Sequence, residues 1–195
     1  MGENFDPNKL LKAFSKLQLK PGYTLGFRIR KVFLGGLGKV FLKKDNEEIE
    51  FYEDPDIFET KKETETQIDS FIFEESDLGY FQLAWFMEEV KLLSLFWHAV
   101  YISTSLVYSF EDFKTFAKGD FFPQAKRDIS FWETLKEIDL RPTISYAKNE
   151  VIVNMYRFSS WGGVFLAKYI VKDNEKLIRE RISDYVVEFH CHISF

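Results

Sequence analysis

Residues 143–171 read TISYAKNEVIVNMYRFSSWGGVFLAKYIV, and the predicted fold class starts from them. Their β-branched and aromatic side chains predict three strands, at Thr143–Tyr146, Val151–Phe158 and Val164–Val171. The links between them, Lys148-Asn149 and the five residues Ser159–Gly163, are short and rich in turn-forming residues. The stretch therefore predicts an antiparallel sheet.

Further along the chain, Asn174–Ile182 predicts a short helical piece and Tyr185–Phe195 predicts a last strand. Because side chains alternate across a strand, one face of this strand would be core: Tyr185, Val187, Phe189, Cys191, Ile193 and Phe195. The other face would carry Glu188, His190 and His192.

A second group of strands is predicted near the N-terminus. Asp6-Pro7 is typical of an N-cap followed by proline in the first turn, and predicts a helix over Pro7–Leu17. The glycine-rich Gly35-Gly36-Leu37-Gly38 predicts a break between two strands, as in a hairpin connection. Alternating or extended patterns predict strands on both sides of it and beyond: Tyr23–Arg30, Val40–Lys43, Ile49–Glu53 and Gln67–Glu74.

Helical patterns lie between the two groups of strands. Ser76-Asp77 is typical of an N-cap and predicts a long helix from Leu78, whose apolar residues cover too many directions for a surface helix. A strand is predicted within Val100–Tyr108, and helices at Phe110–Ala117 and Ile129–Ile138. The predicted class is α+β, with a mixed or mainly antiparallel sheet built from N- and C-terminal β-meanders packed on a largely buried central helix. We expect a single domain over residues 1–195.

Composition favours a cytoplasmic protein. Aromatic residues make up 18% of the chain, including 22 Phe, and such rings usually fill a core. The lone cysteine, Cys191, excludes an internal disulfide, and no apolar leader opens the sequence. Leu92–Phe110 contains no Asp, Glu, Lys or Arg, but its His98 and several hydroxyl side chains favour buried protein over a membrane span.

Charge is distributed unevenly along the chain. Residues 1–44 carry ten basic and two acidic side chains, whereas residues 45–77 carry fourteen acidic and two basic ones. Consecutive segments are usually neighbours in space, so the basic segment is one candidate to compensate the acidic segment. The alternative is that the acidic segment is a docking surface for a basic partner, which its negative charge would attract.

The docking hypothesis assigns partner binding to seven carboxylates and one aromatic residue. The residues are Glu47, Glu48, Glu50, Glu53, Asp54, Asp56, Glu59 and Trp161. Trp161 would stand at a hairpin tip, either folded back on the sheet or exposed as the kind of anchor that dominates interfaces.

The Glu188, His190 and His192 face is a candidate metal site. Two histidines and one carboxylate can hold zinc or iron with open positions for water or substrate. A solvated strand face gives the same alternation, and residues two apart on a strand lie about 6–7 Å from one another, which is wide for two ligands of one ion.

Another possible motif lacks the residue spacing that its function needs. GGLGK at Gly35–Lys39 lacks both the four residues and the Ser or Thr that a phosphate loop needs. The leading hypothesis is therefore a non-enzymatic protein-binding module of inhibitor, immunity or adaptor type, with no cofactor, no membrane partner and no nucleic acid. The alternatives are a metal-dependent hydrolase or oxygenase that uses zinc or iron, and a binder of an apolar small molecule.

Overall fold

A computed structural model of the chain describes residues 6–32, 35–44, 68–92, 104–117, 129–159, 163–173, 176–181 and 186–188. Helices and antiparallel sheets together confirm the predicted α+β class. The chain divides into two compact units, the first of Met1–Ala99 with Val171–Leu177 and the second of Val100–Ile170 with Ile178–Phe195. A single domain over residues 1–195 stays a prediction.

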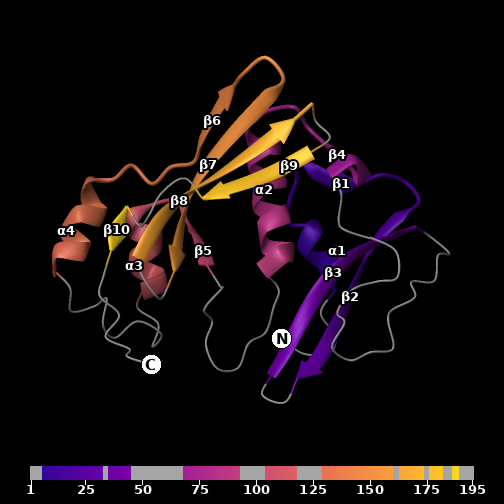
Figure 1. The fold of residues 1–195 in the computed structure, drawn as a ribbon, viewed down its shortest axis with the longest axis horizontal. Helices are drawn as coiled ribbons and strands as arrows, with labels where there is room; N and C mark the ends of the chain where they lie inside the picture. The colour runs from indigo at the N-terminus through magenta and orange to yellow at the C-terminus, as the bar shows by residue number, and fades with distance from the viewer. Residues whose placement is uncertain are drawn as a thin grey trace. The chain divides into compact units, whose positions relative to one another are not determined.

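In its described residues, the first unit contains two helices, a 3-10 turn and two small antiparallel sheets (Figure 1). Its elements are α1 (Pro7–Leu11), β1 (Leu17–Leu19), β2 (Tyr23–Val32), β3 (Gly35–Lys44), η1 (Ile68–Ser70), β4 (Phe71–Phe73) and α2 (Asp77–Leu92). The predicted strand at Ile49–Glu53 lies outside the described residues. β1 pairs with β4, and β2 pairs with β3.

Helix α1 begins where the sequence predicts and ends earlier. The side chain of Asp6 accepts a hydrogen bond from the backbone of Asn8, and Pro7 opens the helix. The predicted end at Leu17 is wrong, because Leu17–Leu19 pairs with Phe71–Phe73 as strand β1. Lys9, Lys12, Lys16 and Lys20 recur every three or four residues, a spacing typical of one helix face. They do not share such a face, because α1 ends at Leu11.

The β2–β3 ribbon is a ten-residue antiparallel pair with a regular register. The predicted break at Gly35–Gly38 is wrong, because Gly36 and Gly38 pair within the ribbon with Lys31 and Ile29. Cross-strand pairing overrides the low strand propensity of glycine here. The connection between the two strands therefore falls at residues 33–34, outside the described residues.

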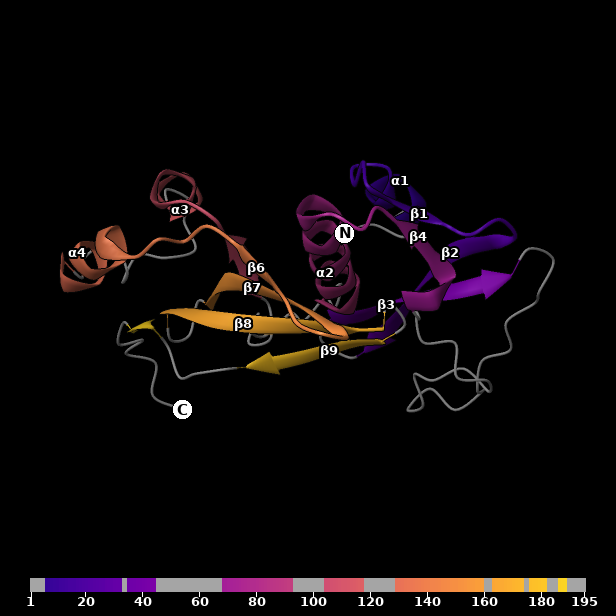
Figure 2. The ribbon, with the colours of Figure 1, turned by 90° about the horizontal axis from the view of Figure 1, so that it is seen from above.

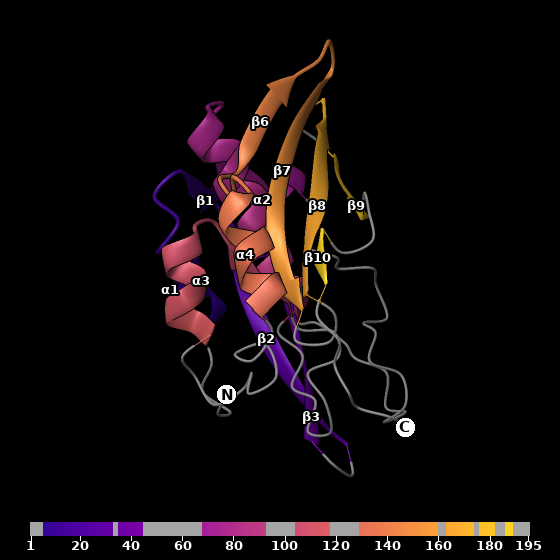
Figure 3. The ribbon, with the colours of Figure 1, turned by 90° about the vertical axis from the view of Figure 1, so that its left-hand side faces the viewer.

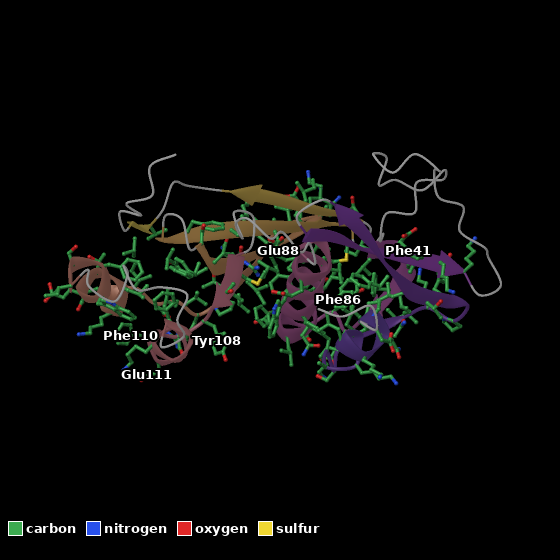
Figure 4. All side chains as sticks on the ribbon, turned by 90° about the horizontal axis from the view of Figure 1, so that it is seen from below. Phe41, Phe86, Glu88, Tyr108, Phe110 and Glu111 are labelled. Carbon is green, nitrogen blue, oxygen red and sulfur yellow. The ribbon has the colours of Figure 1, made fainter. Side chains whose placement is uncertain are left out.

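Helix α2 starts at the predicted N-cap. The backbone N–H of Gly79 donates to Ser76 Oγ over 3.2 Å. Its buried side chains are Tyr80, Leu83, Ala84, Phe86, Met87, Glu88 and Val90. The ring of Phe86, labelled in Figure 4, makes edge-on contacts with Phe14 and with Phe71 of β4. These contacts hold α2 against β4 and against Phe14, which lies between α1 and β1. Its predicted central position in a single fold stays a prediction.

Where the structure describes it, the second unit consists of a six-stranded sheet and two helices. Its elements are β5 (Thr104–Val107), α3 (Phe110–Ala117), α4 (Ile129–Glu137), β6 (Thr143–Tyr146), β7 (Glu150–Ser159), β8 (Gly163–Lys172), β9 (Lys176–Arg181) and β10 (Val187–Glu188). The ends of β8 and β9 belong to the first unit. The predicted strand between 100 and 108, both helices and the three strands of residues 143–171 are confirmed.

Strands β7 and β8 lie side by side at the middle of the sheet (Figure 3). β6 pairs with Val151–Asn154 of β7, and β5 pairs with Tyr156–Ser159. β5 and β6 are thus consecutive partners along one edge of β7. β9 and β10 both pair with β8.

Helices α3 and α4 cover one face of this sheet (Figure 2). The core between them is aromatic: the ring of Phe113 lies 4.8 Å from that of Phe158 on β7 and 5.8 Å from that of Phe131 on α4. Val107, Leu135, Leu140, Val164 and Val187 complete the cluster. The predicted role of the phenylalanines as core residues is confirmed at these positions.

The predicted helical piece at Asn174–Ile182 is wrong, because Lys176–Arg181 is strand β9 and pairs with β8. Asp173 supplies the turn between them with a positive φ of 48°. Of the predicted last strand, the described residues are Val186–Glu188, where Val187 is buried as expected.

The stretch Leu92–Phe110 is not one long helix. Leu92 ends α2 and Thr104–Val107 is strand β5. Within the described ranges, every helix is too short or too polar to cross a membrane.

Candidate functional site

The predicted partner-binding residues lie outside the described residues. This holds for all seven carboxylates of the segment and for the aromatic residue: Glu47, Glu48, Glu50, Glu53, Asp54, Asp56, Glu59 and Trp161. Their surface stays a prediction. The described end of the acidic segment is Ile68–Asp77.

That end carries four exposed carboxylates, three at the β4–α2 corner and one in η1. They belong to Asp69, Glu74, Glu75 and Asp77. No basic residue occurs between Ile68 and Val90 in the sequence. Like charges held on one corner raise the local negative potential, which attracts cationic groups.

The basic N-terminal segment supplies an ion pair to this corner. Lys16 Nζ lies 2.5 Å from Glu74 Oε2, with side chains 35% and 51% exposed. The hydrogen bond from Lys16, followed by one from Ser76, holds the pKa of the Glu74 carboxyl below its ordinary value. An exposed pair of this kind contributes little to stability. It shows that the two oppositely charged segments meet at this point.

The turn between β4 and α2 holds the corner in place. The backbone N–H of Glu74 donates to the carbonyl of Lys16 over 3.1 Å, and that of Ser76 donates to the carbonyl of Glu74 over 2.8 Å. A Cβ at Gly79 would overlap the carbonyl oxygen of Glu74, so the close approach of helix to turn requires glycine. The carboxylates of the corner therefore project from a fixed backbone.

The metal-site prediction stays a prediction. Glu188 ends strand β10, where its backbone is paired with Gly163, and His190 and His192 lie outside the described residues. In the part of the chain that is described, no three His, Cys, Asp or Glu side chains gather closely enough to hold a metal ion.

The small-molecule alternative would need an enclosed apolar pocket. A hollow that the described residues line lies on α4, where Glu133, Thr134, Lys136 and Glu137 surround it. These lining residues are polar or charged, so the hollow does not have the apolar lining that such a ligand needs.

The sequence did not lead us to predict that two charged residues are buried. Arg157 on β7 is 0% exposed and Glu88 on α2 is 1% exposed. A guanidinium keeps its charge when buried, so it requires acceptors around it. Alternation along β7 could have found Arg157, because it shares a strand face with Val151, Val153 and Met155.

Comparison of the chain with known protein families, with curated proteins and with solved structures found no match.

Proposed function

We propose that this protein is a non-enzymatic protein-binding module that docks a basic partner through its acidic segment, residues 45–77. The observation that carries the proposal is the described end Ile68–Asp77, where the exposed carboxylates of Glu74, Glu75 and Asp77 stand at a fixed β4–α2 turn and that of Asp69 lies in η1. The same segment carries ten more carboxylates between residues 45 and 67.

The segment has a strongly negative charge of its own, because it contains fourteen acidic residues and two basic ones, Lys61 and Lys62. Among the described residues, Lys16 pairs with Glu74. A basic partner would relieve the repulsion among these carboxylates, and their negative potential would attract it before contact.

The test uses a short fluorescent polylysine peptide as the probe. Its affinity for the whole protein, measured by anisotropy, should fall at least about tenfold when NaCl is raised from about 50 mM to about 500 mM, because salt screens exposed charges. Binding that does not change over this range would contradict the proposal.

Matched variants separate a docking surface from overall charge. Glu47→Gln/Glu48→Gln should weaken binding of the peptide, whereas Glu133→Gln/Glu137→Gln on α4, with the same change in net charge, should leave it unchanged. Equal effects of the two variants would mean that the peptide senses only net charge, and the proposal would fail.

A further inference from the structure

Helix α2 leaves one stripe of side chains outside the core of its unit. Between Leu78 and Val90, the half-buried and exposed residues recur at the spacing of a single helix face. We call this stripe the outer face of α2, and its residues are Leu78, Phe81, Gln82, Trp85 and Glu89. A surface helix normally turns polar and charged side chains outward, whereas three of these five are large and apolar.

The apolar side chains of the outer face are accessible and held in place. Leu78 is 46% exposed, and Phe81 and Trp85 are half-buried. The rings of Phe81 and Trp85 lie 5.6 Å apart, and Trp85 packs edge-on against Phe14 at 5.3 Å. A partner that covers these side chains would therefore bury apolar area without first having to order both rings.

Carboxylates stand at both ends of the outer face. Glu75 and Asp77 are exposed and precede Leu78 at the β4–α2 turn. At the other end, Trp85 Nε1 donates to Glu89 Oε1 over 3.2 Å, which keeps that carboxylate beside the indole ring. The outer face is thus apolar along its middle and negative at its ends.

The cation beside the outer face already has an acidic partner. The backbone N–H of Lys16 donates to Gln82 Oε1 over 2.7 Å, which brings Lys16 next to the helix. Its ammonium group pairs with Glu74 of the corner. No basic residue occurs between Ile68 and Val90 in the sequence, so the region favours cationic groups from outside.

From these observations we propose that the outer face of α2 binds an amphipathic basic helix of a partner protein. Leu78 and Trp85 lie about two turns apart, or about 10 Å along the helix axis, which matches the spacing of anchors on a partner helix. Apolar residues of that helix would cover the stripe, and its lysines or arginines would meet the carboxylates. The proposal rests on the docking function above, because it names the kind of partner that the acidic region would take.

Charge argues against a second copy of this chain as the occupant. In a two-fold symmetric dimer the same patch meets itself, so the carboxylates of Glu75, Asp77 and Glu89 would approach those of the other copy. Like charges brought together in an interface repel one another, and a basic helix replaces this repulsion with attraction.

The test compares two fluorescent peptides of about 18 residues, long enough to form a helix, that contain leucine and lysine in the same proportion. In one peptide the leucines fall on a single helix face, and in the other they are scattered. Anisotropy with the whole protein should show at least about tenfold tighter binding of the first, because only it can bury a continuous apolar stripe. Equal affinities of the two peptides would overturn the proposal.

Variants at Leu78 test the contact itself. Leu78→Gln should weaken binding of the amphipathic peptide by about tenfold, since it removes the most exposed apolar side chain of the face. Leu78→Met keeps an apolar side chain of similar volume and should change the affinity by less than about threefold. The matched control is Ile129→Gln on α4, which removes an apolar side chain that is 72% exposed and should leave binding unchanged. Because these side chains are exposed, all three variants should unfold near the temperature of the wild type.

Two further results would overturn the proposal. One is an equal effect of Leu78→Gln and Ile129→Gln on binding of the amphipathic peptide. The other is a concentration-dependent dimer of the wild type, seen by sedimentation and abolished in Leu78→Gln, which would assign the outer face to a second copy. Equal binding of the two leucine–lysine peptides, together with salt-sensitive binding of polylysine, would count against this proposal alone. Polylysine binding that does not depend on salt would count against the docking function.

Discussion

Asn8 closes the outer edge of the β2–β3 ribbon, and its removal should cost a large part of the stability of the first unit. Its side-chain amide donates to the carbonyl of Leu25 over 2.8 Å and accepts from the N–H of Leu25 over 2.9 Å. The same amide nitrogen donates to Asp6 Oδ1 over 3.0 Å. Asn8 thus takes the place of a third strand at Leu25.

The magnitude follows from these three hydrogen bonds. Each contributes about 1 kcal/mol net, and a backbone group left without a partner beside the buried Leu25 adds a desolvation cost. Asn8→Ala should therefore lower the free energy of unfolding by about 3 kcal/mol. Asn8→Asp keeps the shape but turns the donor into an acceptor that faces two oxygens, so its effect at neutral pH should be at least as large.

Urea unfolding followed by circular dichroism measures this change in the free energy of unfolding. The comparison is valid if the free energy falls with urea concentration at the same slope in both proteins. Asn154→Ala is the control, because it removes one exposed hydrogen bond, from Asn154 Nδ2 to Thr143 Oγ1. The control should lose less than about 0.5 kcal/mol. A loss in Asn8→Ala no larger than that of the control would refute the role of Asn8 as an edge partner.

Three other predictions concern single positions. Gly79→Ala should lower the free energy of unfolding, measured in urea, by about 1–3 kcal/mol, because the new Cβ would overlap the carbonyl of Glu74. The same change at an open helix position stabilises a helix, so a gain in stability here would contradict the overlap. Phe113→Ala should cost about 3–5 kcal/mol, since the ring is 1% exposed and contacts three other aromatic rings; a loss below about 1 kcal/mol would show that the core collapses around the gap. Hydrogen bonds from Arg141 lower the pKa of Asp139 to about 2, so an NMR titration should show this value in the wild type and a value nearer 3.8 in Arg141→Gln. Because the folded pKa is depressed, the pair should contribute stability above pH of about 4 and lose it as pH falls through about 2; an unshifted Asp139 would contradict the pairing.

Local patterns were sufficient for the elements whose periodicity is strong. Helix α3 and strand β6 occupy the residues predicted for them, Phe110–Ala117 and Thr143–Tyr146. In both elements, the spacing of apolar residues and the flanking turn residues predict the same secondary structure. The N-caps at Asp6 and Ser76 were also readable, because a cap is a contact between residues two or three apart.

Long-range pairing decided the elements that the sequence reasoning placed wrongly. Leu17–Leu19 leaves the helical pattern because its partner is Phe71–Phe73, more than fifty residues away. Lys176–Arg181 is strand because β8 lies beside it, and Gly36 lies in a strand because Lys31 faces it. Propensity is a weak prior when a neighbouring strand offers hydrogen bonds.

The same division holds for charge and function. The number of charges in each segment, and hence the contrast between residues 1–44 and 45–77, can be counted along the chain. Which charged residues become neighbours depends on the fold, which pairs Lys16 with Glu74 and sets the backbone of Arg28 opposite that of Lys39. Electrostatic energy depends on separation in space, and separation along the chain does not give that distance until strand register and helix packing are set.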